Sequence, residues 1–154
     1  MYFARSSASR SGAIAEADAV YPHLVRRLVR AGLERWDQPD LAESAELLVT
    51  ELVTNALKHG RGTDIGVRLY LTTSHLVMEV RDGSSERPVL RTAAPEDEDG
   101  RGLFLVDAIA DAWGVTPDGT STWCSLPSPA GSAQTEPATT TAPPPAPHSQ
   151  PGTR

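Results

Sequence analysis

The chain has 154 residues, of which 39% are hydrophobic and 22% charged, and its formal net charge is −6. This length allows one ordinary domain, and the acidic charge argues against a nucleic-acid binder, which usually carries a basic stripe. The single cysteine, Cys124, excludes an intramolecular disulfide and a cysteine-based zinc site. No apolar run approaches the roughly 18 residues of a membrane span, and the first residues lack the apolar stretch of a secretory signal. We therefore expect a soluble, cytoplasmic protein.

Composition separates one folded region from two flanking segments. Residues 1–14 show no apolar pattern, so we expect a flexible N-terminus. From Pro127 onward the chain is rich in Ser, Thr, Ala and Pro and nearly uncharged. Such a segment cannot bury enough apolar surface to offset the entropy of ordering it. These patterns predict one domain over residues 15–127 and a disordered tail over residues 128–154.

Two helices are expected first. Apolar residues at helical spacing predict a helix over His23–Trp36. A second helix should begin after Asp40, with Glu43 completing a capping box, and should end at Gly60. Its apolar stripe is the clearest pattern in the chain: Leu41, Ala45, Leu48, Val49, Leu52, Val53, Ala56 and Leu57.

The second half of the domain reads as two hairpins around a helix. Alternating apolar residues and turn signals predict strands at Ile65–Leu71, Leu76–Arg81, Trp113–Thr116 and Ser121–Leu126. A polar stretch, Ser84–Asp99, precedes a third helix at Leu103–Ala112. This order predicts an α/β (α+β) fold, a two-layer sandwich in which helices cover one face of a mixed β-sheet.

Four polar residues on the second helix are the first candidates for chemistry. Glu51 and Asn55 lie one turn apart at the edge of the apolar stripe, followed by Lys58 and by His59, which the helical angle places within the stripe. A carboxylate and an amide so placed suit a base and a Mg²⁺ ligand, since Mg²⁺ prefers oxygen. The alternative is an ordinary polar edge of a core helix.

Two further patterns have both a functional and an ordinary explanation. Asp82, followed by Gly83, ends an apolar strand and is either a turn or a carboxylate that accepts a hydrogen bond from an exocyclic amine. The stretch Gly100-Arg101-Gly102-Leu103 opens a helix. Glycines there let a phosphate approach the helix N-terminus, but they also suit a flexible hinge.

Together these segments resemble a known family. The stretch Glu51–Gly60, ELVTNALKHG, resembles the N box of the GHKL ATPases, which carry the Bergerat ATP-binding fold. Asp82-Gly83 matches the start of the G1 box, Gly100–Val106 the G2 box, and Gly119–Trp123 resembles the closing strand. The resemblance is strongest to the anti-sigma-factor serine kinase branch and spans roughly residues 15 to 127.

The resemblance implies roles for individual residues. Glu51 would be the general base, Asn55 the Mg²⁺ ligand, and Asp82 the partner of the adenine amine. Gly100 and Gly102 would hold the ATP phosphates. The remaining positions implied at the nucleotide site are Lys58, His59, Gly83, Arg101, Leu103 and Ser121, the last standing where the family often has Thr, with Ser84–Asp99 as a lid.

The G1 region departs from the family pattern. The usual box is D-x-G-x-G, but after Asp82-Gly83 the chain reads Ser84-Ser85-Glu86, so both later glycines are absent. Two functions therefore remain open. One is a cytoplasmic ATP- and Mg²⁺-dependent kinase that phosphorylates Ser or Thr on a small anti-anti-sigma-like partner and also binds a sigma factor. The other is a non-catalytic module that only sequesters a protein. In both we expect no direct contact with nucleic acid or membrane, and a homodimer is compatible with either.

Overall fold

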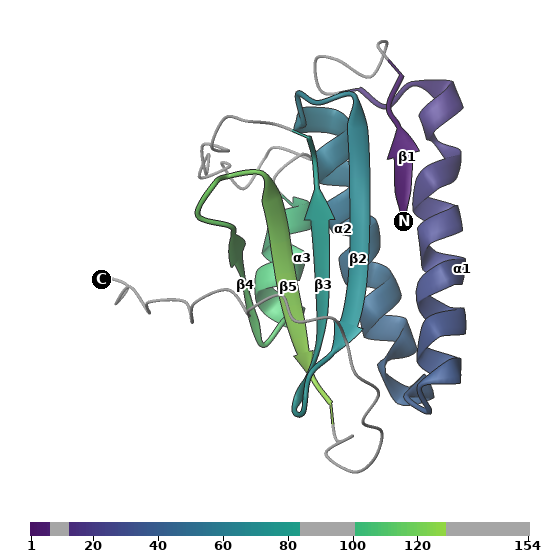
Figure 1. The fold of residues 1–154 in the computed structure, drawn as a ribbon, viewed down its shortest axis with the longest axis vertical. Helices are drawn as coiled ribbons and strands as arrows, with labels where there is room; N and C mark the ends of the chain where they lie inside the picture. The colour runs from purple at the N-terminus through teal and green to yellow at the C-terminus, as the bar shows by residue number, and fades with distance from the viewer. Residues whose placement is uncertain (7–12, 84–100, 129–154) are drawn as a thin grey trace.

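In the part of the chain that the structure describes, helices cover one face of an open β-sheet and leave the other face bare (Figure 1). The computed structural model describes residues 1–6, 13–83 and 101–128. The helices of this part are α1 (Val20–Arg35), α2 (Ala42–His59) and α3 (Arg101–Ile109), with short 3-10 turns at Glu16–Asp18 and Pro39–Leu41. The strands are β1 (Tyr2–Ala4), β2 (Asp64–Leu71), β3 (His75–Arg81), β4 (Ala112–Val115) and β5 (Ser121–Pro127). The expected two-layer α/β sandwich is confirmed.

The described sheet is antiparallel throughout, where a mixed sheet was expected. The strand order is β1-β2-β3-β5-β4, and each neighbouring pair runs antiparallel. The unit β3–α3–β4 does bring β4 into the same direction as β3. However, β5 lies between them and pairs with both, so no two parallel strands become neighbours.

The core lies between α2 and the sheet. Leu48, Leu52 and Leu57 of α2 and Met78 of β3 are at most 1% exposed. Burying each such side chain stabilises the fold by about 1.5–3 kcal/mol relative to leaving it exposed. The central helix is therefore held firmly in place, and any polar group on its edge has a defined position relative to the sheet.

A buried carboxylate joins α1 to α2. Glu46 of α2 is 7% exposed, and its Oε1 lies 2.6 Å from Nε of Arg30, while Oε2 lies 3.7 Å from Nε of Arg26. A buried charge needs such a partner, because desolvation alone would make it unfavourable. The two arginines belong to α1, so this contact fixes one helix against the other beside the apolar packing.

Both boundaries of the predicted domain differ from the sequence analysis in one respect each. Within the N-terminal segment expected to be flexible, residues 2–4 pair with β2 as strand β1. Phe3 stacks on Tyr21 of α1 at 4.0 Å between ring centroids, and this contact anchors the strand. At the other end Ser128, expected to begin the tail, is buried and donates to Oε1 of Gln38 at 2.9 Å. The rest of the predicted tail lies outside the described residues.

Helix boundaries also needed correction. The expected capping box is wrong: α2 follows a 3-10 turn that starts at Pro39, and no side chain caps it at Leu41. Proline at the start of that turn sets the backbone direction instead. The helix α3 ends at Ile109, earlier than expected, because Ala112 already pairs in the sheet. No helix in the described part of the chain is long and apolar enough to cross a membrane.

Candidate functional site

One edge of α2 carries three of the four predicted polar residues. Glu51, Asn55 and Lys58 follow one another at i, i+4 and i+7, which places them on one helix face. All three are half-buried. His59 does not lie within the buried stripe as expected; it is exposed in the last turn of the helix. The polar face therefore consists of a carboxylate, an amide and an ammonium group along about 10 Å of helix.

The N-terminus of α3 lies against the carboxylate of this face. A Cβ built on Gly102 would lie 2.6 Å from Oε2 of Glu51 and 3.7 Å from its Cδ. The absence of a side chain at Gly102 lets the carboxylate approach the first turn of α3. The structure thus brings two sequence-predicted site residues, one from each helix, into direct proximity.

A second cluster forms where α2 ends. The amide of Gly62 donates to the carbonyl of Asp82 at 3.3 Å, and the amide of Asp82 donates to the carbonyl of Thr120 at 3.2 Å. A Cβ on Gly60 would lie 2.9 Å from Cβ of Asp82. Gly83 has φ +68°, a left-handed conformation that glycine adopts without strain. The loop after α2, the end of β3 and the start of β5 therefore meet around Asp82.

These two clusters define the ends of one polar strip. Glu51 and Gly60 are nine residues apart, or about 14 Å along the axis of α2, and Asn55 lies between them. Leu103, which follows Gly102 at the start of α3, is half-buried. The remaining G2 residue, Gly100, and the predicted lid lie outside the described residues, as does the side chain of Arg101.

Ser121 does not belong to this strip. In the β3–β5 register Ser121 pairs with Arg81, whereas Thr122 pairs with Val80, a core residue 1% exposed. Neighbours along a strand point to opposite faces, so Thr122 faces the helices and Ser121 faces away. Ser121 therefore does not join the other predicted site residues on the helix-covered face. The hydroxyl on that face belongs to the neighbouring Thr122, which the sequence analysis did not single out.

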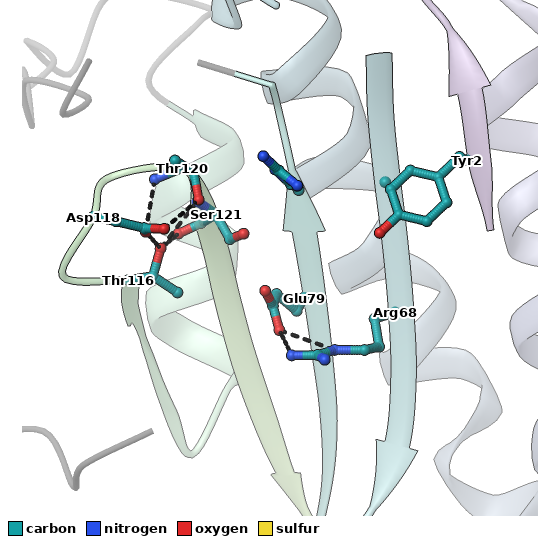
Figure 2. A pocket seen from close by; sticks show the side chains of 9 residues that line it. Tyr2, Arg68, Glu79, Thr116, Asp118, Thr120 and Ser121 are labelled. Atoms are coloured by element: carbon teal, nitrogen blue, oxygen red, sulfur yellow. Dashed lines mark hydrogen bonds and ion pairs between the residues drawn. The ribbon is translucent and has the colours of Figure 1, made fainter. Parts of the chain in front are cut away.

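Ser121 instead lines a shallow hollow of about 320 Å³ on the bare sheet face (Figure 2). Across it, Arg68 on β2 pairs with Glu79 on β3 at 2.6 Å. At its rim, hydrogen bonds from Thr116 and Thr120 lower the pKa of Asp118 to about 2. Arg68 and Glu79 thus pair with each other and Asp118 accepts from threonine hydroxyls, and the hollow is separated from the α2 strip by the sheet itself.

One contact to the strip comes from a residue that sequence reasoning did not single out. The guanidinium of Arg5, just after β1, donates to the carbonyl of Gly60, and its amide donates to the carbonyl of Thr63 at 2.6 Å. No sequence signal marked this residue, because residues 1–14 showed no apolar pattern. The N-terminal strand thus holds the loop that packs on Asp82.

Cys124 takes no part in the site. It is fully buried in β5, and burial raises the pKa of its thiol to about 12. The prediction that it is a small core hydrophobe rather than a redox thiol agrees with this position, because a reactive cysteine needs an accessible thiolate.

Comparison with known proteins gives two matches. A family model described as a histidine kinase-like ATPase domain matches residues 15–126. The chain is also 42% identical over 71 residues to an uncharacterized protein of Streptomyces coelicolor, an alignment that covers 44% of this chain and 68% of that protein. The family match includes α2 with its polar strip, the end of β3 and the start of α3. The chain belongs to the histidine kinase-like ATPase domain family, an ATP-binding fold of the GHKL type.

Proposed function

We propose that this ATP-binding domain is a protein kinase of the anti-sigma-factor type, acting in the cytoplasm on a Ser or Thr of a small anti-anti-sigma-like partner and also binding a sigma factor. The observation that supports it best is the α2 strip, with Glu51 against Gly102 at one end and Asp82 against Gly60 at the other. The Glu51 end would hold the phosphates beside the base, and the Asp82 end would hold the adenine. The two ends of the strip thus correspond to the two ends of ATP.

In this mechanism Glu51 accepts the proton of the attacking hydroxyl. The hydroxyl oxygen forms a bond to the γ-phosphorus, and the bond from that phosphorus to the β–γ bridging oxygen breaks. ADP then leaves with the electron pair. Asp82 accepts a hydrogen bond from the adenine amine. Its position is set by the Gly62 and Thr120 backbone contacts.

The side chains fit a nucleotide-bound Mg²⁺ better than a protein-held metal. The described residues contain no group of three or more His, Cys, Asp or Glu that could hold a metal ion. Mg²⁺ at nucleotide sites takes one or two protein oxygens and completes its shell with phosphates and water, so the amide oxygen of Asn55 is a sufficient protein ligand. When bound, Mg²⁺ would neutralise charge that develops on the phosphates.

A second function has its own support. Ser84 and Glu86 stand where the G1 box has its two later glycines, which favours a module that binds ATP weakly or not at all and sequesters a partner without phosphorylating it. The two functions predict different behaviour of the wild-type protein: both retain the partner, but only the kinase transfers phosphate to it.

The test starts with the partner and then uses two variants on α2. Proteins that co-purify with the chain are identified by mass spectrometry, and transfer of labelled γ-phosphate from Mg-ATP to the recovered partner is measured. Glu51→Gln should keep Mg-ATP affinity within a few-fold while transfer falls by roughly 10²–10⁴. Asn55→Ala should lower both. Wild type that binds Mg-ATP yet transfers nothing would favour the sequestering module, and no binding at millimolar Mg-ATP would refute the kinase and leave the sequestering module.

The adenine end is tested separately. Asp82→Asn should weaken ATP binding and reduce discrimination against GTP, because an amide can turn its NH₂ toward the base and a carboxylate cannot. Thr122→Val should weaken Mg-ATP binding, and Ser121→Ala on the opposite sheet face is its matched control. An equal effect of the two β5 variants would contradict the placement of the nucleotide on the helix side.

A further inference from the structure

Glycines near the strip meet two kinds of neighbour. At Gly60 and Gly62 an added Cβ would collide with backbone atoms, which belong to elements of the fold. At Gly102 the atom within 3 Å is Oε2 of Glu51, the far end of a flexible side chain. A methyl group at 102 therefore leaves the backbone in place and forces the carboxylate to rotate away.

Gly102 also lies in the first turn of a nine-residue helix, where the backbone conformation does not require glycine. Its φ is not among the left-handed values, which among described glycines occur only at Gly83 and Gly119. Alanine would fit the helix better than glycine does. The reason for glycine must then lie outside the helix, and among the described residues the contact within 3 Å is the Glu51 carboxylate.

We infer that Gly102 is a positioning residue for Glu51: the bare first turn of α3 admits the carboxylate and sets the rotamer in which it accepts the hydroxyl proton. This inference rests on the proposed kinase function and adds to it. A glycine that only admits phosphates would, when replaced by alanine, cost nucleotide affinity. A glycine that positions the base would cost transfer rate at saturating nucleotide and leave affinity nearly unchanged.

The decisive variant is Gly102→Ala, with Gly32→Ala as the matched control. Gly32 lies inside α1, and its added Cβ would meet only Cδ2 of Leu69 at 3.6 Å, an ordinary contact. Both variants should melt at or above the wild-type temperature. Gly102→Ala should bind Mg-ATP within about threefold of wild type, yet transfer at saturation should fall on the order of 10-fold or more, up to the roughly 10²–10⁴ of complete general-base loss. Gly32→Ala should transfer at the wild-type rate.

A conservative change on the other partner gives a rescue. Glu51→Asp retracts the carboxylate by one methylene, which makes room for the new methyl group. Combining it with Gly102→Ala should cost less than the sum of the two single effects, which is the mark of direct coupling. Additive effects on the transfer rate would overturn the inference.

A structural measurement tests the contact between Gly102 and Glu51 independently of enzyme activity. In labelled protein, a nuclear Overhauser cross-peak should join Hα of Gly102 to Hγ of Glu51 and should disappear in Gly102→Ala. Absence of the cross-peak in wild type overturns the inference. So does loss of Mg-ATP affinity in Gly102→Ala with an unchanged saturating rate. A wild type that shows the cross-peak but never transfers phosphate refutes the proposed function, and with it the role of Gly102 in positioning a base.

Discussion

Gly60 offers the sharpest test of how the fold holds the Asp82 end of the strip, the end that we propose binds adenine. Its φ of −60° and ψ of 152° are open to alanine, so Gly60→Ala introduces no backbone strain of its own. The added Cβ, however, would lie 2.5 Å from the carbonyl oxygen of Ala56, 2.9 Å from Cβ of Asp82 and 3.2 Å from its carbonyl oxygen. These atoms belong to α2 and to the end of β3, and they cannot rotate away as a side-chain tip can.

The expected cost follows from that geometry. Overpacking against fixed atoms costs about 1–3 kcal/mol, and alanine returns about 0.4–1 kcal/mol by restricting the unfolded chain. The free energy of unfolding should therefore fall by about 1–2 kcal/mol, which for a domain of this size lowers Tm on the order of 5–10 °C. Mg-ATP affinity should fall by at least about tenfold, because Asp82 is among the atoms that must shift.

Urea unfolding and calorimetric binding of Mg-ATP measure the two effects. Gly32→Ala is again the control, since its added methyl meets only a leucine tip and should stabilise α1 by up to about 1 kcal/mol. If Gly60→Ala unfolds at the wild-type urea concentration and binds Mg-ATP as well as wild type does, the packing of the loop against Asp82 does not exist as described.

Three further predictions concern the rest of the domain. Glu46→Gln leaves the two α1 arginines without a carboxylate and should lower the free energy of unfolding by about 1 kcal/mol, a value discounted because those arginines are half exposed; urea unfolding should show the loss shrinking in high salt. The lowered pKa of Asp118 means that its folded-state hydrogen bonds stabilise the protein above about pH 4, and this contribution should be lost as pH falls toward 2. The melting temperatures of wild type and Asp118→Asn should therefore converge over that range. Removing residues 129–154 should leave Tm within about 1 °C, whereas removing Ser128 as well should lower it, because Ser128 bonds Gln38 and Ser74.

Local patterns predicted the elements that bury one continuous face. The stripe on α2 and the alternation in β2 and β3 are strong because these elements lie at the centre of the sandwich. β1 was missed because three residues carry no period, and its strand conformation depends on pairing with β2 and on the Phe3–Tyr21 stack. The antiparallel sheet was missed for a related reason. The insertion of β5 between β3 and β4 is a long-range event that no local pattern reports.

In the candidate site, too, local spacing predicted some features, and others depend on packing between distant segments. Spacing along one helix correctly placed Glu51 and Asn55 at the half-buried edge of the apolar stripe. It failed for His59, because helical angle alone assumes that the sheet covers α2 to its last turn, and His59 is exposed there. The approach of Gly102 to Glu51 depends on how α3 packs on α2, which spacing within either helix cannot reveal.

The closing strand shows why a one-residue error matters most in a sheet. After Ser121 and Thr122 the sequence carries apolar side chains at both alternate positions, since Trp123 faces the bare side while Cys124 is fully buried. Alternation therefore could not decide which hydroxyl faces the helices, and a shift of one residue exchanges the two faces of a strand. Pairing resolves the choice: Thr122 lies beside Val80, two residues before Asp82, so it lies on the helix-covered face of the sheet. In the proposed function the strip on α2 thus gains a hydroxyl from β5, while Ser121 belongs to the opposite face with Arg68 and Glu79.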